Sequence, residues 1–261
     1  MPLTWSFCVL DSEGQVVDEE APDTVQPTAS VGKVFLLCEV AERLGDGRLD
    51  PHARVCRDPQ VAVADSGLWQ HLAHDSLPLV DACLLVAAVS DNWATNVLLE
   101  TVGLDAVAAR AEALGCARSG LHDRVRDVRA ADDPPALSSG TARELAEVAR
   151  RIHVSARGGE VGGISGEAAR LVEGWLVTGV DLSMVAAPFR LDPLAHAEGR
   201  VRLWSKTGRD TGIRADMGVA WTGTDAMAYA AIATWEPGED RGEEAFTRMH
   251  ALGSALSSRL W

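Results

Sequence analysis

The stretch Thr28-Ala29-Ser30-Val31-Gly32-Lys33 places a serine and a lysine three residues apart at the start of an apolar helical pattern. Side chains with this spacing share one helix face, with Cβ atoms about 5–6 Å apart. The hydroxyl of Ser30 would lie beside an amine that can accept its proton, as a serine nucleophile requires. The helix is expected to end at Gly45, which puts Ser30 at a helix N-terminus, where backbone N–H groups stabilise negative charge.

Lysine is rare in this chain. Of the 24 lysines and arginines only two are lysines, Lys33 and Lys206, and arginine supplies the rest. A lysine loses its proton when it is buried or lies near another cation, whereas an arginine effectively does not. A compositional preference for arginine does not account for the positions of the two lysines, because each lies in a short polar motif.

Length and charge restrict the class of protein. The 261 residues are 47% hydrophobic, which predicts a globular chain of one large or two interleaved domains. A formal charge of −14 argues against nucleic acid or a membrane as partner. Five cysteines without a Cys-x-x-Cys pair, and a start without signal-peptide features, favour a reducing compartment. We therefore expect a cytoplasmic monomer that acts on a small molecule.

Strand-like segments gather at the two ends of the sequence. Alternating or apolar runs predict strands over residues 5–10, 15–17, 201–205, 217–222 and 227–234, and the middle of the chain is mainly helical. This distribution predicts that the termini pair in one sheet and that the middle forms an inserted helical domain. We expect a sheet domain from residues 1–29 and 186–261, a helical domain from residues 30–185, and a site in the cleft between them.

Three short motifs occur in a fixed order: Ser30-Val31-Gly32-Lys33, Ser90-Asp91-Asn92 and Lys206-Thr207-Gly208. The second follows an apolar helical run, and the third ends a predicted strand before a turn. A single Ser-x-x-Lys is common in amphipathic helices, but the ordered set is highly specific. Over essentially its whole length, the chain resembles class A β-lactamases and penicillin-binding serine hydrolases, which carry this trio.

The resemblance implies an α/β (α+β) fold in which helices flank an antiparallel sheet, and it implies roles for the motif residues. Ser30 would attack a carbonyl carbon, Lys33 would accept the proton, and Ser90 would carry a proton to the leaving group. The backbone N–H groups of Ser30 and Arg209 would form the oxyanion hole.

Further residues would bind the substrate in such an enzyme. Lys206 would lower the pKa of the first lysine and complete the catalytic set. With Thr207, Gly208 and Arg214 it would also hold a substrate carboxylate, while Asn92 would contact a substrate amide. For Arg214, a solvated charge on a strand is an equally good interpretation.

One motif of class A β-lactamases, Glu-x-x-Leu-Asn, has no counterpart here. In the corresponding loop, residues 121–129, Val125 or Arg126 stands where the glutamate that activates the deacylating water belongs. The nearest acids are Asp123 and Asp127, and either could be a displaced base or the partner of a neighbouring arginine. We therefore expect deacylation to be weak or unconventional. The segment 181–199 is longer than is usual in the family, and we expect it to add a wall to the cleft.

Three functions fit these features. The first is a serine hydrolase that acylates Ser30 with a lactam, amide or ester. The second is a covalent binder of β-lactams with slow turnover, and the third is an esterase or amidase of secondary metabolism on the same scaffold. A glutaminase shares the first motif, but the second and third motifs favour the lactamase type. No cofactor or metal is expected, because His71 and His74 lack a third ligand with matching spacing.

Overall fold

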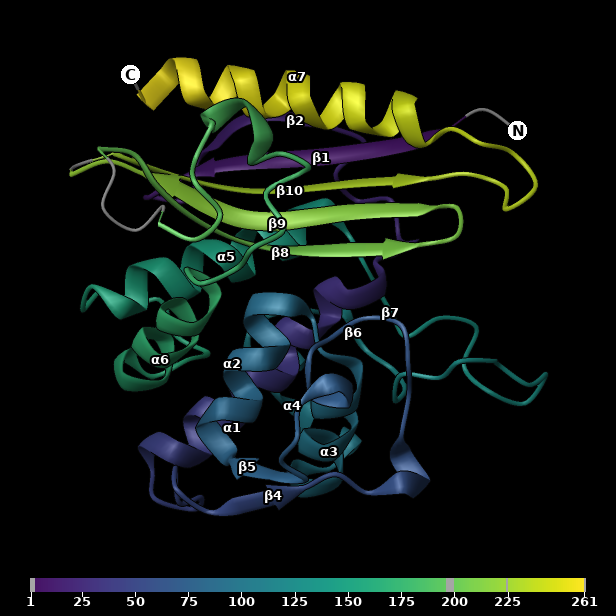
Figure 1. Cartoon of the computed structure of the whole chain (residues 1–261). Coiled ribbons are helices and arrows are strands. Elements are labelled where there is room, and N and C mark those ends of the chain that lie inside the picture. Colours follow the sequence, from purple (N-terminus) through teal and green to yellow (C-terminus); the bar gives the residue numbers. More distant parts are fainter. Residues whose placement is uncertain (1–2, 196–199, 224, 261) are drawn as a thin grey trace.

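The structure, a computed structural model, describes residues 3–195, 200–223 and 225–260. Its largest sheet has the strand order β2-β1-β10-β9-β8, and all four neighbouring pairs are antiparallel. The strands are β1 (Thr4–Asp11), β2 (Val16–Glu20), β8 (Arg202–Asp210), β9 (Ile213–Trp221) and β10 (Ala226–Thr234). Because β1 pairs with β10 over its whole length, the two ends of the chain share one sheet, as the sequence predicts (Figure 1).

Both faces of this sheet are buried. Residues of β10 alternate between two hydrophobic clusters, with Ala228, Ala230 and Ile232 in one and Tyr229, Ala231 and Ala233 in the other. Helix α7 (Gly242–Leu260) covers the second face through Met249, Leu252 and Leu256, and α5 (Ala142–Ala156) packs on the first (Figure 1). Burial on both faces explains why β10 is an almost unbroken apolar run.

The remaining helices pack around α1 (Lys33–Gly45), whose first nine residues are all buried. Apart from Lys33 and Glu39 these buried residues are apolar, as is typical of a helix at the centre of a domain. Around it lie α2 (Leu79–Val89), α3 (Asn92–Val102), α4 (Leu104–Ala113) and α6 (Gly166–Leu176). Short 3-10 turns occur at η1 (Ala29–Gly32), η2 (Pro59–Val61), η3 (Trp69–His71) and η4 (Ala187–Phe189). No helix within the described residues has the length and apolar character to span a membrane.

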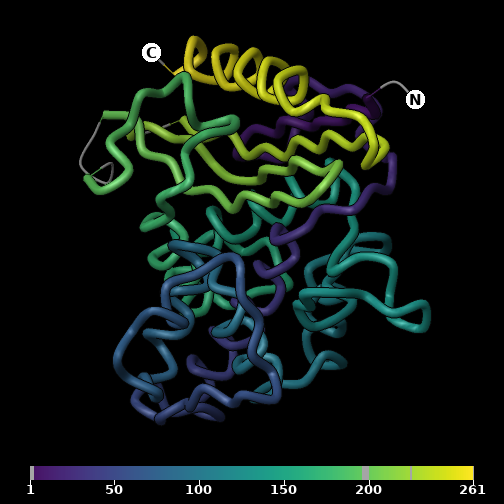
Figure 2. The backbone as a smooth tube through the Cα atoms, turned by 45° about the vertical axis from the view of Figure 1, so that its right-hand side comes forward, coloured from purple at the N-terminus to yellow at the C-terminus, as the bar shows by residue number. Residues whose placement is uncertain are grey.

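Two small sheets complete the architecture. Strands β4 (Arg54–Cys56) and β5 (Ser76–Pro78) form one pair, and β3 (Gln26–Pro27), β7 (Ser138–Gly140) and β6 (Gly120–Leu121) form a three-stranded sheet. From the sequence, residues 121–139 were expected to form only a loop, whereas the structure has the short strands β6 and β7 at its two ends. Between β6 and β7 the chain forms a projecting loop, drawn in teal in Figure 2. The division into two domains stays a prediction, and α5, from the predicted helical domain, packs on the sheet.

The segment that follows α6 only partly forms the expected wall. Met184, Val185 and Phe189 are buried in the cluster under α7, so this portion belongs to the core. Asp181 lies at the cavity described below. Residues 196–199 lie outside the described part of the chain.

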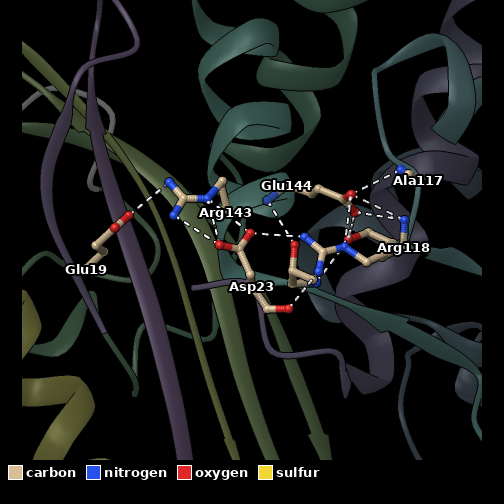
Figure 3. A network of polar contacts seen from close by, with 8 residues as sticks. Glu19, Asp23, Ala117, Arg118, Arg143 and Glu144 are labelled. Carbon is tan, nitrogen blue, oxygen red and sulfur yellow. Dashed lines mark hydrogen bonds and ion pairs between the residues drawn. The ribbon is translucent and has the colours of Figure 1, made fainter. Parts of the chain in front are cut away.

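A network of ion pairs and hydrogen bonds at the surface of the molecule links β2 to α5 (Figure 3). Arg143 of α5 pairs with Glu19 of β2 at 2.9 Å and with Asp23 at 3.1 Å. Asp23 also pairs with Arg118 at 3.0 Å, and Glu144 accepts hydrogen bonds from the backbone N–H groups of residues 117 and 118. Exposed pairs stabilise little one by one, but a linked set fixes the relative position of three segments.

Candidate active site

The turn that carries Ser30 is held in an unusual backbone conformation. Ala29 has φ of 48°, in the left-handed region that residues with a Cβ rarely adopt. The hydroxyl of Ser138, from β7, donates to the carbonyl of Ala29 and lies 2.7 Å from Thr28 Oγ1. The backbone of β7 also accepts a hydrogen bond of 3.1 Å from the N–H of Thr28. Backbone strain supported by its surroundings is typical of functional sites, and Ser30 lines a cavity.

Lys33 is fully buried one helical turn beyond Ser30. Its Nζ donates to the carbonyl of Ser90 at 2.7 Å and to Asn92 Oδ1 at 2.8 Å, and it lies 3.2 Å from Ser90 Oγ. Burial and the positive charge of Lys206 hold the pKa of Lys33 well below its ordinary value. A lowered pKa makes the neutral form of the amine, whose lone pair can accept a proton, easier to reach than in an ordinary lysine.

Lys206 approaches the same hydroxyl from β8. Its Nζ lies 3.0 Å from Ser90 Oγ and 2.8 Å from the carbonyl of Thr207, and the side chain is buried. Burial lowers the pKa of Lys206 to about 8, although the carboxylates of Asp181 and Asp216 oppose the shift. Ser90 Oγ thus lies within hydrogen-bond distance of both lysine amines.

Asp91, the middle residue of the second motif, positions its neighbours. One carboxylate oxygen accepts the backbone N–H of Ala94 and caps α3, and the other accepts those of Leu68 and Trp69 at 2.7 and 2.8 Å. Ser90 itself ends α2 with φ of 56°. The motif therefore turns the chain sharply between two helices, so that Ser90 and Asn92 both contact Lys33.

Gly208 lets β8 pass directly over the Ser30 turn. A Cβ at this position would collide with the carbonyl oxygen of Thr28 and lie only 3.2 Å from the backbone nitrogen of Ser30. Only glycine permits this approach. The next residue is Arg209, whose backbone N–H was predicted to complete the oxyanion hole. Its guanidinium donates to Ser183 Oγ at 3.2 Å and lies 5.5 Å from the centre of the Phe246 ring.

A cavity of about 740 Å³ brings most of the predicted site together. Its lining includes seven of the predicted residues: Ser30, Ser90, Asn92, Asp127, Lys206, Thr207 and Arg209. Arg214 is not among the lining residues. Its guanidinium lies 5.5 Å from the Trp235 ring and 5.7 Å from the Phe246 ring, and its Nη1 donates to the carbonyls of Asp210 and Ile213. The carboxylate-binding hypothesis required Arg214 to line the cavity, and the structure does not place it there.

The two acids considered as deacylation bases have different surroundings. Asp123 is buried and accepts hydrogen bonds from Arg126 at 2.7 Å and Arg129 at 2.6 Å. Burial raises its pKa, but these arginines outweigh burial and hold the pKa below the usual value. Asp127 is exposed and lines the cavity. Of the two, only Asp127 is placed to meet a water molecule in the cavity.

Asn96 fixes the loop that carries these acids. It accepts a hydrogen bond from the backbone N–H of Val125 at 2.8 Å and donates to the carbonyls of Val125 and Val61. No role was predicted for Asn96 from the sequence. Its position four residues after Asn92, on the same helix face, was the available signal.

Asp181 is the second residue that the sequence analysis missed. Its carboxylate accepts the hydroxyls of Thr207 at 2.9 Å and Ser183 at 2.6 Å. Burial raises its pKa, but these hydrogen bonds outweigh burial, and the pKa lies below the usual value. It lies in a connecting segment without a motif, so its contact with Thr207 emerges only from the fold.

An antiparallel sheet covered by helices, with the three motifs collected around one cavity, defines a serine hydrolase of the class A β-lactamase type. The chain belongs to the β-lactamase enzyme family, whose family model matches residues 2–259.

Solved structures agree in fold. A β-lactamase from Sphaerobacter thermophilus superposes with a TM-score of 0.81 and 25% identity, covering 98% of this chain and 91% of the other. A mutant of PBP-A, in an acyl-enzyme complex with penicillin G, has a TM-score of 0.80 and 18% identity over 99% and 91% of the two chains. A variant of the class A β-lactamase of the last common ancestor of Gram-negative bacteria has a TM-score of 0.79 and 20% identity, covering 98% of this chain and 92% of the other. No curated protein sequence matches the chain.

Proposed function

We propose that the protein forms an acyl-enzyme at Ser30 with a lactam, amide or ester, and that it releases the acyl group slowly. The observation that carries the proposal is the position of Ser90 Oγ, 3.2 Å from Lys33 Nζ and 3.0 Å from Lys206 Nζ at the cavity that Ser30 lines. In this arrangement the Lys33 amine, with its lowered pKa, would act as base, the Ser90 hydroxyl would relay a proton, and the Lys206 cation would favour the neutral state of the base.

In the proposed acylation, Ser30 Oγ attacks the carbonyl carbon and its proton passes to the neutral amine of Lys33. The carbonyl oxygen becomes negative and is stabilised by the backbone N–H groups of Ser30 and Arg209. When the intermediate collapses, the bond from carbon to the leaving nitrogen or oxygen breaks. The leaving atom receives a proton from Ser90, which regains one from Lys33, and an ester on Ser30 remains.

Deacylation needs a base for water, and the surroundings of Asp123 argue against a fast step. Its carboxylate already accepts hydrogen bonds from two arginines, so it is poorly placed to take a proton from water. Asp127 is the remaining candidate from the sequence, and we propose that it supports only slow hydrolysis. The same observation favours a second candidate function, a covalent β-lactam binder with little turnover. The cytoplasmic location and the monomeric state stay predictions.

The lifetime of the acyl-enzyme separates these functions. The protein is mixed with a chromogenic cephalosporin, the excess is removed, and intact-protein mass is followed over time beside the Ser30→Ala variant. We expect an adduct that forms on the wild-type chain alone and decays slowly. Rapid decay with multiple turnovers would mean a working β-lactamase. The absence of any adduct, with Ser30-dependent hydrolysis of simple esters, would instead indicate an esterase or amidase.

A further inference from the structure

We infer that the cavity selects substrates whose leaving group carries a positive charge, and that Asp181 is the residue that recognises this charge. The inference deepens the proposed function and rests on acyl transfer at Ser30. It replaces the carboxylate expected at this position with a group of opposite charge, such as an alkylammonium.

The carboxylate of Asp181 is fixed at the cavity wall. It accepts the hydroxyl of Thr207 at 2.9 Å, and both the hydroxyl and the backbone N–H of Ser183, at 2.6 and 3.2 Å. Within the part of the chain that the structure describes, no lysine, arginine or histidine forms an ion pair with it. An ionised carboxylate that is oriented but not ion-paired can attract a cation of the ligand.

Asp181 lies on the leaving-group side of the proposed reaction. Ser90, which would protonate the leaving atom, contacts Lys206. The next residue of β8 is Thr207, and its hydroxyl donates to Asp181. All four residues line the cavity. The part of a substrate that departs from Ser30 toward Ser90 would therefore extend along this wall to the Asp181 carboxylate.

Other charges at the cavity act in the same direction. The lining contains three further carboxylates, Asp65, Asp127 and Asp210, and none of them forms an ion pair within the described residues. Among the lining cations, Arg126 and Arg129 already pair with Asp123.

The remaining cations do not cancel the charge of Asp181. Arg209 lowers the pKa of Asp181 through space, but its guanidinium donates to Ser183 and lies over the Phe246 ring. Lys206 has a pKa of about 8, so it is mostly charged at neutral pH, but its Nζ contacts Ser90 Oγ and the carbonyl of Thr207 and forms no ion pair with Asp181 within the described residues.

A substrate carboxylate at this position would meet two obstacles. The Thr207 hydroxyl that should donate to it is already donated to Asp181, and Arg214 lies away from the cavity. The carboxylate would also face a like charge. A positively charged leaving group would instead be attracted by the Asp181 carboxylate. In a partly screened site, this difference in interaction energy between a cationic and an anionic leaving group corresponds to a ratio of acylation rates of about ten- to hundredfold.

Three thioacetates with the same acyl group and different leaving groups test the inference. Acetylthiocholine supplies a cation, S-(3,3-dimethylbutyl) thioacetate supplies a neutral group of the same shape, and S-acetyl-3-mercaptopropionate supplies an anion. Thiol release is followed with Ellman's reagent, and Ser30→Ala serves as the blank because Cys56 is exposed and reacts with the reagent. Asp181→Asn keeps the side-chain shape and removes the charge. Asp225→Asn, at a separate cavity, is the matched control for net charge.

We expect the Ser30-dependent release rate to fall from cation to neutral to anion, with a cation-to-anion ratio of at least about tenfold. The ratio should collapse toward one in Asp181→Asn and persist in Asp225→Asn. Ser30-dependent release without charge preference, or a preference unchanged in Asp181→Asn, overturns the inference and leaves the proposed function intact. If none of the three thioesters gives Ser30-dependent release, and the cephalosporin gives no adduct, the proposed function itself fails.

Discussion

Lys206 Nζ lies 3.0 Å from Ser90 Oγ, a contact at the cavity between a strand of the sheet and the end of a helix. Lys206 comes from β8, whereas Ser90 ends α2, more than a hundred residues earlier. The same hydroxyl lies 3.2 Å from Lys33 Nζ on α1. A movement of β8 relative to α1 and α2 would break the contacts of Ser90 Oγ with the two lysines, so catalysis through these contacts requires that the three elements keep their positions.

The pH dependence of acylation follows from the two lysines. Because the pKa of Lys33 is lowered, its neutral, reactive form becomes available as pH rises, and the rate should increase on the acid side. Lys206 has a pKa of about 8, so its charge is lost as pH rises through that value and the rate should fall again. Rapid-mixing measurements of acylation should therefore give a bell-shaped profile.

Lys206→Arg is the variant that checks this profile. Arginine keeps its charge throughout the accessible range, so the descending limb near pH 8 should disappear while the ascending limb remains. Circular dichroism establishes that the variant is folded. A descending limb retained in Lys206→Arg would contradict the assignment.

Gly208→Ala should reduce the acylation rate by about a hundredfold or more, because displacement of β8 by a fraction of an ångström would disturb the two proposed oxyanion donors, the backbone N–H groups of Ser30 and Arg209. The added methyl group would collide with the Thr28 carbonyl, as the short approach there indicates. Gly174→Ala is the control: it lies in α6, has no atom near the added methyl group, and should stabilise the helix by about 0.5–1 kcal/mol. Equal acylation rates in Gly208→Ala and wild type would show that the close contact between β8 and the Ser30 turn is not needed for acylation.

Asn96→Ala should destabilise the protein by about 2–4 kcal/mol, because it leaves the buried backbone groups of Val125 and Val61 without their hydrogen bonds. Urea unfolding measures the change. Thr101→Ala, which removes one hydrogen bond on the same helix, should cost much less. A loss below about 0.5 kcal/mol in Asn96→Ala would mean that other contacts hold the loop.

Asp216→Asn should change the pH dependence of stability. Asp216 lies opposite Thr207 in the sheet, and its burial raises its pKa well above the ordinary value. The folded chain then retains a proton that the unfolded chain releases above about pH 4, so Asp216 lowers the free energy of unfolding by up to about 1.4 kcal/mol per pH unit until its folded pKa is reached.

The asparagine has no proton to lose. Relative to wild type, Asp216→Asn should therefore be more stable at pH 8 than at pH 4, as measured by chemical unfolding at both values. An identical stability difference at the two pH values would show that Asp216 is ionised in the folded protein.

The two loop acids should differ in what their removal changes. Asp123→Asn removes the carboxylate that pairs with Arg126 and Arg129, so it should lower the melting temperature by several degrees. Asp127→Asn should leave the melting temperature unchanged and lengthen the life of the acyl-enzyme severalfold. If Asp123→Asn alone slowed deacylation in a protein of unchanged stability, Asp123 would be the base instead.

The periodicity of the sequence predicted those parts of the fold that depend on local pattern. The apolar run Leu79–Val89 is a helix with those boundaries because Pro78 precedes it and Ser90 adopts a left-handed conformation after it. The pairing of the termini also followed from the distribution of strands. The three motifs similarly located residues around the cavity. The first two lie at helix ends, whereas the third, expected to end a strand, lies within β8, which continues to Asp210.

Contacts between distant segments were beyond the sequence pattern. One of the two interpretations of Arg214 placed it with Thr207 around a substrate carboxylate, yet Trp235 after β10 and Phe246 on α7 place aromatic rings next to its guanidinium. Asp181 lies in a connecting segment whose path depends on the packing of Val185 under α7. Neither arrangement has a periodic signature, because each depends on the tertiary contacts of a whole segment.

Mapping the acyl group on the protein tests the central claim most directly. The chain is mixed with penicillin G, quenched in acid and digested, and the modified peptide is identified by tandem mass spectrometry, with Ser30→Ala and Ser90→Ala treated in parallel. We predict an acyl ester on Ser30, no adduct in Ser30→Ala, and a much slower adduct in Ser90→Ala. An adduct on another residue, or one that forms equally fast in Ser90→Ala, would contradict acyl transfer through the Lys33–Ser90–Lys206 arrangement.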